Sequence, residues 1–206
     1  LAARLHSSRG IRARVIGADL ADPQAPARIL AETEGTDIGL VISNAGFNIK
    51  GMFETKEPSA MAKMLTVNCH APMQLAHGFI PRLKARGTGG LVFTSSVEGL
   101  IGCPYSTAYS ASKALVVSLG EGLWGELLGT GIDVLTLCPG ATESEATAGM
   151  AGLDLQPAAE VARLTLDNLR EGPTFIPHPR YREMFDKLRS GPRRETLAGM
   201  AEGMRR

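Results

Sequence analysis

L-V-F-T-S-S-V-E-G-L-I-G-C-P-Y-S-T-A-Y-S-A-S-K-A-L, residues 91–115, predicts a short buried strand that leads through a serine pair and a glycine-rich loop into a helix. The helix carries Tyr109 and Lys113, which are four positions apart and therefore share one helix face. A phenol beside a fixed ammonium is a candidate general acid/base with a lowered pKa. Ser96, at the end of the strand, is placed to hydrogen-bond the oxygen that the tyrosine protonates or deprotonates.

Strands and helices alternate along the chain, which predicts an α/β fold in one domain with a parallel sheet and right-handed crossovers. The expected strands are residues 12–18, 38–43, 91–94, 132–138 and 174–176. The expected helices are residues 25–34, a long region 59–86 that Pro72 and Pro81 kink or break, the Tyr109 helix to about 128, residues 157–169, and a helical tail over 178–206. The run 38–43 is nearly all apolar, which is typical of a parallel strand buried on both faces.

Four short motifs follow predicted strands, at the edge of the sheet where open α/β folds bind their ligands. They are Asp19-Leu20, Asn44-Ala45-Gly46, Ser95-Ser96 and Pro139-Gly140. Because all four would converge on one crevice, together they indicate a ligand site more strongly than any one alone.

Composition excludes several classes of protein. The 206 residues are 44% hydrophobic with a formal net charge of +1, as in a soluble globular domain. Lys and Arg are scattered without interleaved aromatics, which argues against a nucleic-acid partner. No apolar run approaches the roughly 20 residues that span a bilayer.

The cysteines and histidines predict neither disulfides nor a metal site. Cys69, Cys103 and Cys138 are widely spaced and odd in number, which suits reduced, buried thiols in the cytoplasm. The four histidines show no ligand spacing with a carboxylate or a cysteine.

The serine, tyrosine and lysine, with the S-S-x-x-G sequence, the A-S-K segment and an upstream N-A-G, resemble the core of the short-chain dehydrogenase/reductase family. The resemblance implies a Rossmann-like doubly wound sheet and an NAD- or NADP-dependent oxidoreductase that interconverts a carbonyl and an alcohol by hydride transfer. It also implies that Tyr109 is the general acid/base, that Lys113 lowers its pKa and bonds the nicotinamide ribose, and that Ser96 positions the substrate oxygen. Asn68, in T-V-N-C-H, matches the asparagine that distorts its helix and holds a water of the proton relay. Bonding to nearby backbone is the simpler interpretation of one asparagine.

The same resemblance implies contacts with the dinucleotide. Asp19-Leu20 matches a pair that contacts the adenine, although a turn cap explains Asp19 nearly as well. Asn44-Ala45-Gly46 matches N-N-A-G, which lines the adenosine ribose, with Ser43 in place of the first asparagine.

The segment P-G-A-T-E-S at 139–144 resembles the family's P-G-x-x-x-T, whose backbone and hydroxyl hold the nicotinamide carboxamide. We expect Pro139, Gly140, Thr142 and Ser144 to contribute, with Ser144 standing where threonine is usual.

Residues 141–157 correspond to the family's substrate loop. Its Met150, Leu153 and Leu155 hint at an apolar substrate, and simple packing explains them equally well. The resemblance further implies a homodimer or homotetramer built on the Asn68 and Tyr109 helices.

One family feature is absent from the printed sequence: the T-G-x-x-x-G-x-G turn that holds the pyrophosphate at a helix N-terminus. By resemblance the first two strands are missing from the sheet between the strands 12–18 and 38–43, which would leave an unpaired edge. We therefore expect this sequence to be an N-terminally truncated part of a protein roughly 40 to 50 residues longer. The alternative is a non-catalytic Rossmann-like interaction module that has lost dinucleotide binding.

Overall fold

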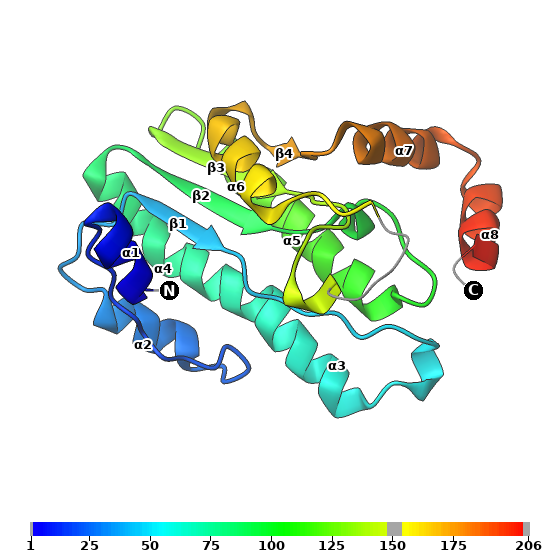
Figure 1. Cartoon of the computed structure of the whole chain (residues 1–206), viewed down its shortest axis with the longest axis horizontal. Helices are drawn as coiled ribbons and strands as arrows, with labels where there is room; N and C mark the ends of the chain where they lie inside the picture. The colour runs from blue at the N-terminus through cyan, green and yellow to red at the C-terminus, as the bar shows by residue number, and fades with distance from the viewer. Residues whose placement is uncertain (1, 148–153, 204–206) are drawn as a thin grey trace.

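A four-stranded parallel sheet forms the centre of the computed structural model, which describes residues 2–147 and 154–203 (Figure 1). The strands are β1 (Leu40–Ser43), β2 (Gly89–Thr94), β3 (Ile132–Leu137) and β4 (Thr174–Phe175). They lie side by side in chain order, and Leu91 of β2 pairs with Val41 on one side and Val134 on the other. The predicted α/β fold with a parallel sheet is confirmed.

Helices connect the strands and flank the sheet at both ends. The α-helices are α1 (Ala2–Arg9), α2 (Ala25–Glu32), α3 (Pro58–Leu65), α4 (Ala71–Arg86), α5 (Thr107–Glu126), α6 (Ala158–Asp167), α7 (Pro179–Ser190) and α8 (Arg193–Gly203). The short elements are η1 (Phe53–Thr55), the π-helical turn η2 (Thr66–His70), η3 (Val97–Gly99), η4 (Glu145–Thr147) and η5 (Leu169–Glu171). Helices α1 and α2 lie at one end of the molecule, and α7 and α8 lie at the other (Figure 1).

The sheet separates two layers of helices because alternate strand residues point to opposite faces. On one face, Leu91 and Phe93 of β2 pack with Val116 of α5 and Leu83 of α4. On the other face, Val92 packs with Val161 of α6. The core thus fixes β2, which Ser96 follows, against α5, which carries Tyr109.

The long helical region is interrupted before Pro72 and continuous through Pro81. The π-helical turn η2 ends at His70, two residues before Pro72, and its backbone continues into α4, since the N–H of Ala71 donates to the carbonyl of Thr66. The interruption predicted at Pro72 is confirmed as this π-helical turn, whereas α4 is not broken at Pro81, which lies inside it.

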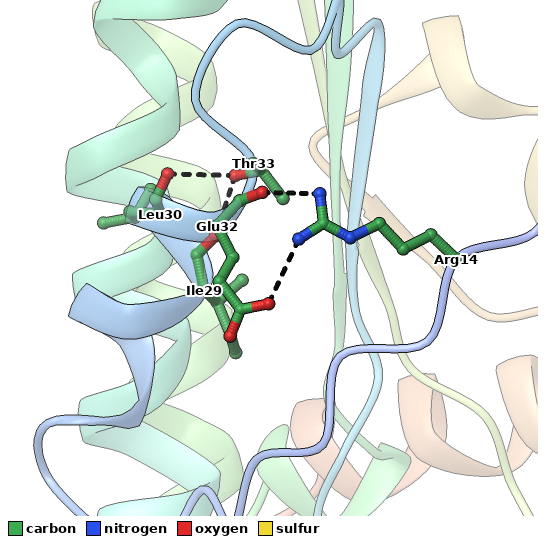
Figure 2. A network of polar contacts seen from close by, with 5 residues as sticks. All are labelled: Arg14, Ile29, Leu30, Glu32 and Thr33. Atoms are coloured by element: carbon green, nitrogen blue, oxygen red, sulfur yellow. Dashed lines mark hydrogen bonds and ion pairs between the residues drawn. The ribbon is translucent and has the colours of Figure 1, made fainter.

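Residues 12–18 are not a strand, and that prediction is wrong. No strand of the described residues pairs with them, so they lack the ladder that stabilises an extended backbone, and Val15 is 78% exposed. The segment is instead anchored through the side chain of Arg14, which donates to the Glu32 carbonyl at 2.8 Å and pairs with the Glu32 carboxylate at 3.2 Å (Figure 2).

Strand β1 is shorter and more exposed than the predicted strand 38–43. It ends the sheet among the described residues, and Leu40 and Ile42 are 38% and 52% exposed. The prediction that this strand is buried on both faces is therefore wrong, because Leu40 and Ile42 share one face of the strand and that face is incompletely covered.

Two further observations concern the predicted class of protein. Within residues 2–147 and 154–203, no helix has the length and apolar character needed to cross a membrane. Cys69, Cys103 and Cys138 are all buried and form no disulfide, as the spacing predicts.

Candidate active site

Three of the four predicted strand-end motifs meet in one cleft of about 910 Å³. Asn44 and Gly46 follow β1, Ser95 and Ser96 follow β2, and Pro139 and Gly140 follow β3; all line the cleft, as do Tyr109, Lys113, Thr142 and Ser144. Because these strands are parallel, their carboxyl ends share one edge of the sheet, which is why residues far apart in sequence converge there.

The Asp19-Leu20 motif is not part of this cleft. The carboxylate of Asp19 accepts a hydrogen bond from the backbone N–H of Ala21 at 2.9 Å, so Asp19 caps a turn ahead of α2. Because residues 12–18 form no strand, Asp19 is not at a strand end, and the structure does not bring it to the other predicted residues.

The two serines after β2 have different surroundings. The hydroxyl of Ser95 is buried and donates to the backbone carbonyl of Lys113 at 2.8 Å, which ties the strand to α5. The hydroxyl of Ser96 accepts from the N–H of Glu98 at 3.1 Å and interacts with the phenol of Tyr109. A structural Ser95 and a site-facing Ser96 are what the alternation of a strand predicts.

Close packing explains why glycine stands at position 99, the last position of the S-S-x-x-G sequence. A Cβ there would lie 2.7 Å from the backbone carbonyl oxygen of Lys113, so η3 packs on α5 more closely than a side chain permits. This close approach holds Ser96 beside Tyr109.

Tyr109 and Lys113 lie on one face of α5, as predicted. The Lys113 ammonium is 5.6 Å from the centre of the Tyr109 ring and donates to the carbonyl of Thr94 at 2.7 Å. Lys113 is only 3% exposed, so a cation is held beneath the cleft at the point where β2 ends.

The pKa of Tyr109 is shifted in the direction opposite to the sequence prediction. Burial raises it to about 12, and the Ser96 hydroxyl offsets only part of the rise. Burial also lowers the pKa of Lys113 to about 8, because the charged form loses hydration. The ammonium points to the Thr94 carbonyl, and desolvation outweighs any stabilisation of the phenolate.

Asn68 lies in the π-helical turn η2 and is 2% exposed. Its amide bonds the backbone of Phe47 in both directions, accepting from the N–H at 3.1 Å and donating to the carbonyl at 3.0 Å. The same amide nitrogen donates to the hydroxyl of Ser112 at 3.0 Å, and Ser112 donates to the carbonyl of Tyr109 at 2.7 Å. Asn68 therefore joins the loop after β1 to the helix of Tyr109.

The C-terminal helices form a wall of the cleft that the sequence interpretation as a tail missed. Tyr181, Met184, Phe185, Leu188 and Met200 line it from α7 and α8. The Tyr181 ring packs so closely on Gly140 that a Cβ there would lie 2.2 Å from the ring. The signal was present in the sequence, since positions 181, 185 and 188 are apolar at helical spacing. Met150 and Leu153 of the predicted substrate loop lie outside the described residues.

Comparison with known families identifies the chain. A family described as short chain dehydrogenase matches residues 1–151. The chain belongs to the short-chain dehydrogenase family. The predicted resemblance is therefore confirmed over most of the chain.

Two curated relatives illustrate the similarity, and both are named as dehydrogenases. The 1-deoxy-11-beta-hydroxypentalenate dehydrogenase of Streptomyces exfoliatus is 32% identical over 199 residues, which cover 88% of this chain and 72% of the relative. A 7beta-hydroxysteroid dehydrogenase of Clostridium sardiniense is 28% identical over 142 residues, which cover 69% of this chain and 54% of the relative. The chain thus spans about half the length of several curated relatives that it matches.

Solved structures show the same fold. A short-chain dehydrogenase from Sphingobium yanoikuyae in complex with NADPH is 31% identical, with a TM-score of 0.80 over 96% of this chain and 80% of that chain. A 7beta-hydroxysteroid dehydrogenase structure has a TM-score of 0.89 over 97% of this chain and 80% of that chain; at 22% identity it speaks for the fold alone.

The cleft fits the nicotinamide end of a dinucleotide. A Cβ on Gly46 would lie 3.0 Å from the Asn68 side-chain oxygen and 3.2 Å from the Lys113 nitrogen, so glycine keeps the floor of the cleft open above both polar groups. Pro139, Gly140, Thr142 and Ser144 form the facing side. The printed sequence contains no glycine-rich turn of the kind that holds a pyrophosphate.

Proposed function

We propose that the protein is an NAD(P)-dependent oxidoreductase that interconverts a carbonyl compound and an alcohol. The observation that supports this most directly is the phenol of Tyr109, which borders the cleft beside the hydroxyl of Ser96 and above the buried ammonium of Lys113. The geometry suits a proton transfer to an oxygen that the Ser96 hydroxyl also contacts.

In this proposal Tyr109 donates its hydroxyl proton to the carbonyl oxygen of the substrate, and Ser96 holds that oxygen by a hydrogen bond. Burial raises the pKa of Tyr109 to about 12, so the phenol carries the proton that it would donate at neutral pH. The nicotinamide, when bound, supplies or accepts the hydride. Lys113 would hold the ribose hydroxyls of the bound dinucleotide, and Asn68 positions the loop and helix that frame the site.

The residues proposed to hold the dinucleotide are those at the carboxyl ends of β1 and β3. They are Asn44, Ala45, Gly46, Pro139, Gly140, Thr142 and Ser144. Asp19 and Leu20, which lie outside this cleft, are proposed for the adenine end of the dinucleotide, and the turn at Ala21 uses only the Oδ1 atom of Asp19.

Replacement of Tyr109 by Phe tests the proposal. The change removes one hydroxyl, so turnover of a ketone should fall by about 10²- to 10⁴-fold, the usual contribution of a positioned acid/base. Dinucleotide affinity, measured by titration of nicotinamide fluorescence, should stay within about threefold because the ring remains in place. Unchanged turnover would remove Tyr109 from the proposed role.

The same titration decides between this function and a non-catalytic module. A protein that binds neither NADH nor NADPH and reduces no ketone would support the module. Tight binding with loss of turnover in Tyr109→Phe would support the oxidoreductase.

We also propose a cytoplasmic homo-oligomer. Leu65 of α3, Met73 of α4 and Leu115 of α5 are 46%, 42% and 40% exposed, which leaves apolar side chains on the helices that carry Asn68 and Tyr109. Light scattering of the purified protein tests the assembly, and a monomer at micromolar concentration would oppose it.

A further inference from the structure

The cleft contains two hydrogen-bond acceptors that the protein leaves unsatisfied. The Oδ1 atom of Asn48 and the Oε2 atom of Glu98 are buried and have no hydrogen-bond partner in the described structure. Both residues line the cleft together with Tyr109. Because a buried acceptor without a donor is unfavourable, a small turn of either side chain toward a donor group in the cleft that it lines would be stabilising.

Glu98 lies close to the proposed acid/base. It is the second residue after Ser96, in the turn η3, and its backbone N–H is bonded to the Ser96 hydroxyl at 3.1 Å. Burial is the main cause of the raised pKa of Tyr109, and the Glu98 carboxylate adds to it, so the negative charge is near the phenol. A substrate whose reacting oxygen meets Tyr109 therefore comes within reach of this charge.

Asn48 provides the second acceptor, from the loop that follows β1. Its amide nitrogen donates to the hydroxyl of Ser106 at 3.3 Å, which fixes the amide and leaves its oxygen without a donor. The two acceptors come from different segments of the chain and border the same cleft, which makes a shared purpose in substrate binding the simplest explanation.

The rest of the cleft is apolar on the side of α7 and α8, where Tyr181, Met184, Phe185, Leu188 and Met200 line it. Lys50 also borders the cleft and is exposed, but among residues 2–147 and 154–203 no ion pair joins Glu98 to a cation. The cleft therefore combines an apolar wall with an uncompensated carboxylate beside the acid/base.

We propose that Glu98 determines substrate specificity and that the substrate is an apolar carbonyl compound or alcohol bearing an additional hydroxyl or ammonium group. The inference rests on the proposed function, since it places the reacting oxygen at Tyr109. The donor group binds the Glu98 carboxylate, with Asn48 as a second acceptor, and the apolar body packs against α7 and α8. A substrate bearing a carboxylate is repelled.

Four cyclohexanones that differ only at position 4 test this proposal, because they carry a methyl, a hydroxyl, an ammonium or a carboxylate group. Binding of each to the full chain is measured by ligand-observed NMR. The protein should bind the hydroxyl and ammonium probes about tenfold or more tightly than the carboxylate probe, the size expected for a charged hydrogen bond gained and a repulsion avoided.

Glu98→Gln should reduce this preference to less than about threefold, since the amide keeps the shape and loses the charge. Glu54→Gln is the matched control, because it removes the same charge from the exposed turn η1 and should leave the preference unchanged. A chain without the preference, or a Glu98→Gln variant that retains it, would overturn the assignment.

Turnover of the same probes with NADH and NADPH separates this inference from the proposed function. A Glu98-dependent binding preference without turnover would support the recognition role and count against the oxidoreductase. Turnover of all four probes without a Glu98-dependent preference would support the oxidoreductase and overturn the role of Glu98.

Discussion

Two regions of this chain place their apolar residues in opposite surroundings. In the segment 10–19, Val15 is 78% exposed and the backbone pairs with no strand of the described residues. At the centre of the sheet, Val134 is 1% exposed and lies on a strand paired on both sides. Both segments have the apolar, β-branched character that predicts a strand, so local pattern alone does not decide the outcome.

The difference shows that a segment forms a strand only when neighbouring strands bond its backbone and other elements cover its side chains. Residues 132–137 pair with β2 along their whole length, Thr136 and Leu137 also pair with β4, and side chains from α5 cover one face. The segment 10–19 is joined to the rest of the molecule by the side chain of Arg14 (Figure 2). The candidate active site lies wholly within the paired sheet and the helices packed on it.

The largest effect on stability should come from removing the side-chain amide of Asn68, which joins the loop after β1 to α5. Asn68→Ala removes three hydrogen bonds from a buried position and leaves the backbone groups of Phe47 without their partner. We expect the free energy of unfolding to fall by about 3 kcal/mol, measured by urea denaturation, because buried groups left unpaired are costly.

Asn168→Ala is the control for Asn68→Ala. The Asn168 amide makes a single bond to the Leu164 carbonyl at the end of α6, so its loss should cost about 1 kcal/mol or less. Equal effects of the two changes would mean that the loop after β1 depends little on Asn68.

Much of the site could be predicted from the sequence because its signals are local. The spacing of Tyr109 and Lys113 fixes a shared helix face, and the alternation of a strand separates Ser95 from Ser96. Each of these statements needs only the geometry of one element, and the structure agrees with each.

What the sequence could not provide depends on contacts between distant segments. The pKa of Tyr109 is raised mainly because the fold buries the phenol, which no spacing in the sequence reveals. The sequence likewise shows Glu98 only as one acidic residue in a loop. Its place in the cleft depends on α7 and α8, which form one side of that cleft.

A paired substitution measures the contrast between the two regions directly. Val134→Ala removes two buried methyl groups from the core of the sheet and should lower the free energy of unfolding by about 2 kcal/mol. Val15→Ala makes the same change on an exposed segment and should alter it by less than about 0.5 kcal/mol. Urea denaturation of both variants is the measurement. A loss at Val15 comparable to that at Val134 would show that residues 12–18 are packed in solution, contrary to the structure.

The smallest expected effect on stability is that of Arg14, and it tests how the exposed segment is held. The Arg14 and Glu32 side chains are 63% and 48% exposed, so their pairing should contribute less than about 1 kcal/mol to the free energy of unfolding. Arg14→Ala should nevertheless make residues 10–19 more accessible, because Arg14 also holds the Glu32 carbonyl. Thermolysin, which cleaves before apolar residues such as Val15, should cut the variant severalfold faster under native conditions. Arg12→Ala is the control, since it makes the same change in charge two residues away. If both variants are cut at the rate of the unmodified chain, the Arg14 contact does not hold the segment. If Arg14→Ala lowers the free energy of unfolding by several kcal/mol, residues 10–19 are packed as firmly as the sheet.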